Sequence, residues 1–564
     1  MNEEDIKPEE PKAKEKIVLK PVEEIILRKT IGKTSSPERE PSTTTQFQFW
    51  LADGIRLNPF DFVTAEHLDD SKTIGIAQDI KNLTDAESHI TNYVSHDFGK
   101  PQAEPYVERV SSAIAQIAVI RNTREPELMM PVPPDRNVYF SSEKEVRLAI
   151  GADQIKGVEI PAGVIRQSNG DIVAVGLDSE YLLGPQAAHI NASGISGLAT
   201  KTSYLMFLLQ SVCQKIGNVA FIIFNVKQSD LLHIHERNDE LCEDDEKLYE
   251  KLGIECKPFE NVEYFLPRGR ADQPTSDRPP SEYKLYAYTL SDVYDRFDLL
   301  FADVDDQYHT LDTYNTRIRN DWDHGQLIIE AESQRNYPGG RQVVRTWTDL
   351  RDAPNELLQH AYDLNPVTPP RIQRELTRLT SSDLFVGNRA TNCVYLGQKI
   401  KEIRSGKIFV IDITNVHSRT QPFVVGDVMR SIDELYRDPS ATERPKLILF
   451  VDELNTIAPA GSTSAITEQL VEVARKGRSR GTILFGAEQF KSDIHDQIVG
   501  NCGTHVIGRT GSAEIRRTAY SFLDETAKQN IMNLARGEMV LSTPNWRSPI
   551  KIVFPRPTYK TLKY

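Results

Sequence analysis

The sequence predicts an α/β fold made of more than one structural unit. The chain has 564 residues, of which 39% are hydrophobic, enough for two or three units with a large core. After about residue 188, apolar runs of strand length alternate with helical stretches, which is typical of a parallel sheet covered by helices. Before that point, short β-like runs separated by turn-forming residues indicate a smaller all-β unit.

The order of these patterns gives the domain boundaries that we expect. Residues 1–45 are rich in Lys, Glu and Pro and predict a disordered charged tail. Residues 46–187 predict a small N-terminal β-barrel, and residues 188–564 predict the α/β domain. Within that domain, the charged stretch at about 238–372 predicts a helical insertion, and about 536–564 predicts a C-terminal β-extension.

Composition narrows the function classes. The net charge of −14 excludes a uniformly basic nucleic-acid binder, although not a protein that contacts phosphates through a lined channel. The five cysteines form no CxxC pair, which indicates reduced thiols. No apolar run is long enough to cross a bilayer, and the start lacks a secretory signal. We therefore expect a cytoplasmic protein without membrane contact.

The first candidate site is the segment SGISGLATKTS, which joins a predicted strand, AHINAS, to a predicted helix. Backbone N–H groups at the start of a helix can surround a polyphosphate such as that of ATP. Lys201 would reach the β- and γ-phosphates, and the Thr202 hydroxyl would bind Mg²⁺. The predicted nucleotide contacts are Gly194, Ser196, Gly197, Ala199, Thr200, Lys201, Thr202 and Ser203. The alternative is a strand–turn–helix junction with a solvated lysine.

This segment departs from the usual P-loop pattern, G-x-x-x-x-G-K-[ST]. Thr200 precedes the lysine, and the glycines fall at Gly194 and Gly197, as if the loop were one residue longer. Thr200 can occupy a helix start because no positive φ is needed there.

The second candidate is the apolar run LILFV, which Asp452 and Glu453 follow directly. Such a run fits a central parallel strand, and ligands bind at the carboxyl ends of such strands. Asp452 would hold Mg²⁺, and Glu453 would orient or deprotonate the attacking water. The alternative is an ordinary strand that ends in a solvated acidic turn.

The third candidate is ARKGRSRGTILFGAEQF, followed by THVIGR. Gln489, at the end of the strand TILFGAE, is a predicted sensor of the γ-phosphate. Arg478, Arg480 and Arg509 are predicted to stabilise transition-state charge, for the first two across a subunit boundary. The alternative for each arginine is helix capping or solubility. Lys227 follows the strand AFIIFNV and is expected near the nucleotide edge or in a loop.

Taken together, these motifs resemble the HerA family of ring-forming P-loop ATPases, within the HerA–FtsK group. The resemblance runs from about residue 46 to the end and rests on HINASGISGLATKTS, LILFVDELNTIAP, ARKGRSRGTILFGAEQF and NCGTHVIGR. The preceding β-unit resembles that family's N-terminal barrel, and GEMVLSTPNWRSPIKIVFP resembles its C-terminal β-extension. The resemblance implies a RecA-like P-loop ATPase core.

The resemblance also implies a homo-oligomer, a hexamer that threads double-stranded DNA through a central pore, driven by ATP hydrolysis. It implies work with a nuclease or sirtuin-like effector protein, in DNA-end processing or bacterial anti-phage defence. Carried over by position, Asp452 and Glu453 form the Walker B pair, Gln489 the sensor, and Lys201 with Thr202 the phosphate and Mg²⁺ contacts. The altered P-loop puts the rate of hydrolysis in question more than nucleotide binding.

Two other functions stay open. The first is a low-turnover ring in which bound nucleotide holds subunits together and scaffolds an effector, which the altered loop and the acidic balance favour. The second is a metabolic P-loop enzyme that acts on a small molecule, against which the basic segment 475–480 argues.

Overall fold

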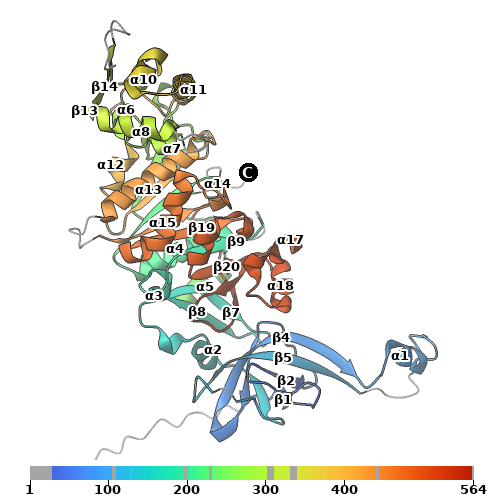
Figure 1. Cartoon of the computed structure of the whole chain (residues 1–564). Coiled ribbons are helices and arrows are strands. Elements are labelled where there is room, and N and C mark those ends of the chain that lie inside the picture. The colour runs from blue at the N-terminus through green and yellow to red at the C-terminus, as the bar shows by residue number, and fades with distance from the viewer. Residues whose placement is uncertain are drawn as a thin grey trace, which may run out of the picture.

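The computed structural model describes residues 28–104, 110–128, 130–195, 197, 201–227, 231–301, 310–330, 340–437 and 444–561. Within these residues the strands form a closed six-stranded barrel, a 13-stranded sheet and a small three-stranded sheet. Figure 1 shows an elongated molecule with the barrel at one end and helices of the insertion at the other. The large sheet occupies the middle and carries the candidate site.

The barrel begins earlier than predicted. Its strand order is β1-β2-β5-β4-β3-β6, and β1 closes it by pairing antiparallel with both β2 and β6. Its strands are β1 (Gly32–Ser35), β2 (Gln46–Leu51), β3 (Phe62–Glu66), β4 (Lys72–Thr84), β5 (Ser111–Asn122) and β6 (Asn137–Phe140). The strand β1 therefore lies inside the stretch predicted as a tail, of which residues 1–27 lie outside the described residues.

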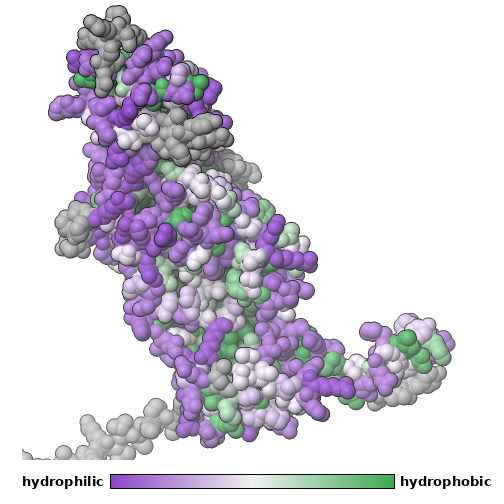
Figure 2. Space-filling model, viewed as in Figure 1, coloured by the Kyte–Doolittle hydropathy of each residue, from purple (hydrophilic) through white to green (hydrophobic). Residues whose placement is uncertain are grey.

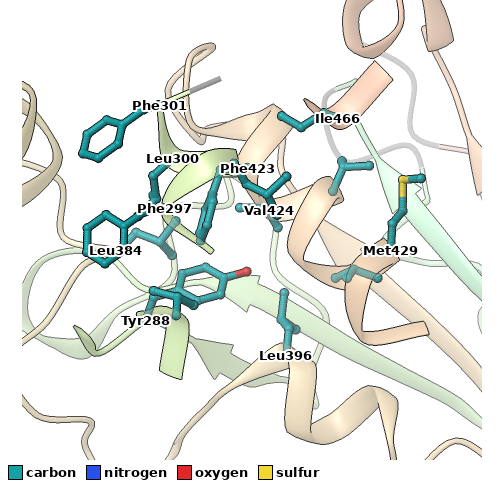
Figure 3. Close-up of a cluster of buried hydrophobic side chains, with 14 of the residues drawn as sticks. Tyr288, Phe297, Leu300, Phe301, Leu384, Leu396, Phe423, Val424, Met429 and Ile466 are labelled. Carbon is teal, nitrogen blue, oxygen red and sulfur yellow. The ribbon is translucent and has the colours of Figure 1, made fainter. Parts of the chain in front are cut away.

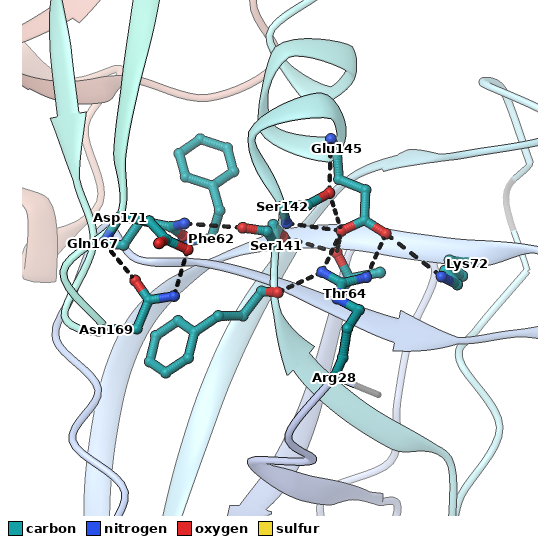
Figure 4. Close-up of polar contacts among 11 residues, drawn as sticks. Arg28, Phe62, Thr64, Lys72, Ser141, Ser142, Glu145, Gln167, Asn169 and Asp171 are labelled. Carbon is teal, nitrogen blue, oxygen red and sulfur yellow. Dashed lines mark hydrogen bonds and ion pairs between the residues drawn. The ribbon is translucent and has the colours of Figure 1, made fainter. Parts of the chain in front are cut away.

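A polar cluster ties the barrel to the rest of the molecule (Figure 4). The helix α2 (Glu143–Ala149) starts with a capping box between Ser142 and Glu145. The Glu145 carboxylate accepts hydrogen bonds from Arg28 at 2.8 Å and from the Ser142 N–H at 2.9 Å. Gln167, just beyond the barrel, donates to the Ser141 carbonyl at 2.9 Å. Because these groups are mostly buried and satisfied, the junction is a packed interface.

An arm projects from the barrel (Figure 1). The strands β4 and β5 run beyond the barrel wall, and the helix α1 (His89–Ser95) lies near their tip. Figure 2 shows hydrophobic surface at this tip. The large apolar side chains exposed there are Leu83, Ile90, Tyr93, Val94, Phe98 and Val110.

The 13-stranded sheet has the order β16-β12-β11-β17-β10-β18-β19-β9-β20-β21-β22-β7-β8, parallel from β16 to β20 and antiparallel beyond. Its parallel strands are β9 (Ile190–Ser193), β10 (Val219–Asn225), β11 (Val262–Pro267), β12 (Lys284–Tyr286), β16 (Cys393–Val394), β17 (Ile408–Asp412), β18 (Lys446–Val451), β19 (Thr482–Glu488) and β20 (Thr504–Ile507). Its antiparallel strands are β7 (Glu159–Arg166), β8 (Ile172–Asp178), β21 (Glu538–Ser542) and β22 (Ile550–Val553).

Two boundaries differ from those predicted. The strands β7 and β8, expected in the barrel, extend the large sheet next to the closing pair β21 and β22. The strands β11 and β12, expected within the helical insertion, pair with the central strand β17. Both differences arise from pairing between segments far apart in the chain, which local sequence patterns do not encode.

Helices cover both faces of the parallel part of the sheet. The helices α4 (Lys201–Lys215) and α5 (Glu243–Leu252) pack on one face, and α13 (Gln421–Arg437) and α15 (Ala465–Arg480) pack on the other. Every residue of β10 is consequently buried, as expected for a central parallel strand. The short helices α3 (Ser179–Leu182), α14 (Leu454–Ile457), α16 (Asp496–Asn501), α17 (Ser512–Ile515) and α18 (Glu525–Met532) complete the body. This architecture confirms the predicted α/β class with a RecA-like core.

The insertion is a compact helical unit. It contains α6 (Leu290–Val293), α7 (Phe297–Leu300), α8 (Thr310–Asp321), α9 (Trp347–Arg351), α10 (Asn355–Tyr362), α11 (Thr368–Thr380) and the small sheet β13 (Trp322–Asp323), β14 (Gln326–Glu330) and β15 (Arg341–Val344). The helix α12 (Leu396–Ile400) follows β16, beyond the predicted end of the insertion at about 372. Figure 3 shows its aromatic and aliphatic side chains packed against α13, for example Phe297 beside Phe423. Among the described helices, no helix combines the length and apolar character needed to span a bilayer.

A buried ion pair fixes the insertion to α13. Arg296 Nε lies 2.7 Å from Asp427 Oδ1, with both side chains almost fully buried. Burial raises the pKa of Asp427 to about 7, and the Arg296 guanidinium opposes that rise. Arg296 also bonds Glu434 at 2.9 Å. Asp427 depends on this pair, because without Arg296 its buried carboxylate would lose its counter-charge.

We therefore predict that Arg296→Ala destabilises the protein by about 3–5 kcal/mol, because Asp427 is left buried without its counter-charge. The lower midpoint should appear in thermal unfolding followed by circular dichroism. Arg351→Ala is the matched control, because Arg351 pairs with Asp352 at the surface and its loss should leave the midpoint unchanged. Equal midpoints for the two variants would contradict the prediction.

Candidate active site

The carboxyl ends of three neighbouring parallel strands bring the predicted residues together. The strands β18, β19 and β9 pair side by side in this order. Asp452 and Glu453 follow β18, Gln489 follows β19, and Gly194 follows β9. The edge formed by these strand ends is where ligands bind in open parallel sheets.

The segment after β9 is held by its neighbours on both sides. The Gly194 N–H donates to the Glu488 carbonyl at 3.2 Å, and the Ile195 N–H donates to the Arg509 carbonyl at 2.9 Å. Gly194 and Gly197 have φ of 153° and 79°, values that side chains disfavour. Of the predicted nucleotide contacts, Ser196, Ala199 and Thr200 lie outside the described residues.

Lys201 and Thr202 open α4 beside this segment, and Ser203 follows in the same turn. Lys201 is only 4% exposed, and its ammonium donates a long hydrogen bond of 3.4 Å to the Gly194 carbonyl. Burial lowers the pKa of Lys201, while Asp452 opposes that decrease. A buried cation at a helix start after a glycine turn is a suitable partner for phosphate.

Thr202 and Asp452 form the contact predicted for a magnesium site. The Thr202 hydroxyl donates to Asp452 Oδ2 at 2.8 Å, although 250 positions separate the two residues. Mg²⁺ is usually bound by one or two protein oxygens together with water and substrate phosphates. This donor set fits such an ion with a nucleotide. No group of three or more His, Cys, Asp or Glu side chains within the described ranges forms an alternative metal site.

Glu453 is held beside this pair in a constrained conformation. Its φ of 53° and ψ of 47° place it in the left-handed region, which is uncommon for a non-glycine residue and clusters at functional sites. Gln489 Nε2 donates to Glu453 Oε1 at 3.3 Å, and Lys227 forms an ion pair with the same oxygen. Burial raises the pKa of Glu453, but Lys227, Gln489 and Lys201 outweigh it and keep the pKa below its usual value.

Lys227 is the contact that the sequence left open. It lies two residues beyond β10, where the sequence allows both a nucleotide-edge position and a loop position. Its ammonium on Glu453 places it at the nucleotide edge. The signal in the sequence was a cation directly after a buried strand, which is common and does not specify a partner.

The arginines divide into two groups. Arg509 follows β20, and its backbone supports Ile195, so it lies at the same edge as Glu453. Arg478 and Arg480 end α15, just before β19 begins, and Arg478 donates to the Gln186 carbonyl at 2.9 Å. The seven residues of β19 separate them from Gln489 by about 20 Å. Within one chain, the structure therefore does not bring Arg478 or Arg480 to the site.

No protein-family model and no curated protein matches this sequence. Among solved structures, the unbound bacterial conjugative coupling protein TrwB aligns with 70% of this chain and 90% of its own, at 12% identity and a TM-score of 0.42. VirB4 of Thermoanaerobacter pseudethanolicus aligns with 71% of this chain and 96% of its own, at 16% identity and a TM-score of 0.42. The plasmid coupling protein TrwB in complex with ADP and Mg²⁺ aligns with 66% and 86%, at 12% identity and a TM-score of 0.41. The roles assigned to single residues rest on the geometry of this chain.

We predict that Thr202→Val weakens nucleotide binding only when Mg²⁺ is present. Valine keeps the shape of the side chain but removes the hydroxyl that would complete the metal site. The Kd of a fluorescent ATP analogue should rise about tenfold in Mg²⁺, corresponding to about 1.4 kcal/mol. In EDTA the variant and the unchanged protein should bind equally. A loss of the same size in both buffers would indicate a distorted start of α4 instead.

Proposed function

We propose that this chain binds ATP with Mg²⁺ and hydrolyses it as the subunit of a ring-forming motor. The observation that carries the proposal is the contact between Thr202 and Asp452, with Lys201 on one side and Glu453 on the other. These four residues come from two distant motifs and meet at one strand edge. An ordinary strand–turn–helix junction with a solvated lysine would not require these four residues to lie together.

Each residue has a distinct role in this proposal. ATP supplies the phosphoanhydride bond and Mg²⁺ the charge that offsets its phosphates. Lys201 binds phosphate oxygens, and Thr202 and Asp452 hold the metal. Glu453 accepts a hydrogen bond or a proton from the attacking water. Gln489, which contacts Glu453, senses the γ-phosphate and links it to the end of the strand β19.

The further parts of the proposal rest on the motif resemblance. They are a hexameric ring, movement along double-stranded DNA through its pore, and partnership with a nuclease or sirtuin-like effector, in DNA-end processing or anti-phage defence. The exposed position of Arg478 supports a contribution from a neighbouring subunit, because its own site lies at the opposite strand edge. We propose that Arg478 or Arg480 acts in this way across a subunit boundary.

A specific observation favours a second candidate function. The ion pair with Lys227 occupies the carboxylate of Glu453 and lowers its basicity. A ring that stays nucleotide-bound and scaffolds an effector, with little turnover, would have such a restrained site. The two functions differ in whether duplex DNA stimulates hydrolysis and whether Glu453 is required.

We predict that Glu453→Gln reduces DNA-stimulated ATP hydrolysis at least 100-fold, because general-base and water-positioning residues contribute about 10²–10⁴ in rate. The Kd for ATP should stay within a factor of two, since Lys201 and Thr202 remain. Phosphate release with and without duplex DNA measures the first quantity, and equilibrium binding the second. Hydrolysis unaffected by Glu453→Gln would reject the motor, and effector function preserved in this variant would support the scaffold.

The same variant tests the arginines. Arg478→Ala and Glu453→Gln subunits are each expected to be inactive alone. Mixed rings should recover part of the activity, because some interfaces then combine an intact Glu453 with an intact arginine. No recovery in rings that verifiably contain both subunits would contradict a contribution of Arg478 from a neighbouring subunit.

We predict that Lys227→Met moves the acid limb of the kcat–pH profile to higher pH. Lys227 holds the pKa of Glu453 below its usual value, so without it Glu453 becomes protonated, and unable to act as a base, at a higher pH. Hydrolysis at saturating ATP across the acid range measures the shift. Lys528→Met is the control, because Lys528 contacts Glu525 far from Glu453. Superimposable acid limbs in all three proteins would show that Lys227 does not control Glu453.

A further inference from the structure

The segment that follows β19 contains a buried lysine close to the sensor. Gln489 is half-buried, Phe490 is exposed, and Lys491 is only 3% exposed. Lysine is almost never buried to this extent without a specific environment, because desolvation of an ammonium is costly. Lys491 is two residues from Gln489, so whatever fixes Lys491 also limits where Gln489 can lie.

A neutral histidine and two aromatic rings surround the Lys491 ammonium. Its Nζ lies 3.3 Å from His505 Nδ1 on β20 and sits over the rings of Tyr520 and Phe522, 5.5 and 5.0 Å from their centroids. Burial and the neighbouring ammonium lower the pKa of His505 to about 3, so its ring is neutral and Nδ1 can accept a hydrogen bond. Aromatic faces attract cations most strongly when water is excluded.

A buried carboxyl lies on the other side of the sensor. Glu488, the last residue of β19, is fully buried, and burial raises its pKa well above the usual value. Lys491 is the strongest of the neighbouring charges that oppose this rise. Gln489 therefore lies between the buried carboxyl group of Glu488 and the buried amine of Lys491. Each of these groups favours the ionised form of the other.

Both ends of the segment are anchored to different elements. The Glu488 carbonyl accepts from Gly194 after β9, while Ser492 donates from its N–H and its hydroxyl to Glu514 on α17, at 3.0 and 2.7 Å. Tyr520, in the 3₁₀ turn Thr518–Tyr520, bonds Ser193 at 3.1 Å. Lys491 thus lies where the strands β9, β19 and β20 meet the C-terminal helices.

We propose that Lys491 is a positioning residue for the hydrolysis described above: its buried ammonium fixes the segment after β19 against β20 and the 3₁₀ turn Thr518–Tyr520, and so holds Gln489 on Glu453. This inference rests on the proposed function. Lys491 touches neither nucleotide nor metal in it, and acts only through Gln489. The role also connects the segment between α17 and α18 to the site, because Tyr520 and Phe522 in that segment supply the aromatic rings.

The decisive experiment is a double-mutant cycle on the full-length protein. Lys491→Met keeps the length and apolar character of the side chain beneath Tyr520 and Phe522 but removes the charge. We expect kcat to fall at least tenfold, with the Kd for ATP within a factor of two and the oligomeric state unchanged. Combined with Gln489→Ala, it should cause no further loss, because both variants remove the same contact. Lys528→Met is the matched control and should behave like the unchanged protein.

A second variant keeps the test valid if Lys491→Met does not fold. Lys491→Arg retains a cation that does not titrate in the accessible range. The groups that face Lys491 are Glu488, Cys502, His505, Glu514 and Tyr520. Burial lowers the pKa of Lys491 to about 8, so kcat of the unchanged protein should fall as pH rises through this value. In Lys491→Arg this alkaline limb should be absent.

The outcomes separate this inference from the proposed function. If the unchanged protein hydrolyses no ATP, the proposed function fails. If the unchanged protein hydrolyses ATP, two results would overturn only the role of Lys491. One is a kcat of Lys491→Met equal to that of the unchanged protein. The other is a fall in kcat that is as large when Lys491→Met is added to Gln489→Ala as when it is made alone. Identical alkaline limbs in the unchanged protein and Lys491→Arg would overturn it equally. Loss of ATP binding in a folded Lys491→Met would assign the lysine to the structure of the site instead.

Discussion

The parallel pairing of β18, β19 and β9 brings Asp452, Glu453, Gln489 and Gly194 to one edge of the sheet. In an antiparallel arrangement, the end of β19 that carries Gln489 would lie at the opposite edge from the ends that carry Asp452 and Gly194. Because all three strands run the same way, Gln489 reaches Glu453 at the edge where Thr202 also contacts Asp452. The helices on both faces then exclude water from the strands, which strengthens each electrostatic contact at the edge.

Much of the site could be predicted because it follows from chain direction. Asp452, Glu453 and Gln489 each end an apolar strand, and Lys201 begins a helix after a glycine turn. The same logic explains why Arg478 and Arg480 lie away from Glu453 of their own chain. Both arginines come just before β19 in the sequence, and Gln489 comes just after it. The two ends of one strand lie at opposite edges of the sheet, so the arginines lie at the edge opposite to Gln489. The order of helix and strand already contained that information.

Other features depend on contacts that local patterns do not encode. The strand β1 is four residues long and lies in a charged stretch, and it is a strand only because β2 and β6 offer two free edges. The ion pair of Lys227 with Glu453 depends on the register between β10 and β18. Lys491 lies in a segment that resembles a solvated turn, and the residues that bury it come from positions 505–522.

The arm formed by β4 and β5 has an electrostatic consequence. Its outer part, from Asp79 to Thr84, is about 20 Å long, and the apolar tip begins at its end with Leu83. At physiological ionic strength, charge repulsion decays over about 8 Å. The net charge of −14, spread over a long body, therefore does not shield the tip from apolar contact. Repulsion between two bodies held this far apart does not oppose contact between the exposed apolar side chains of their tips.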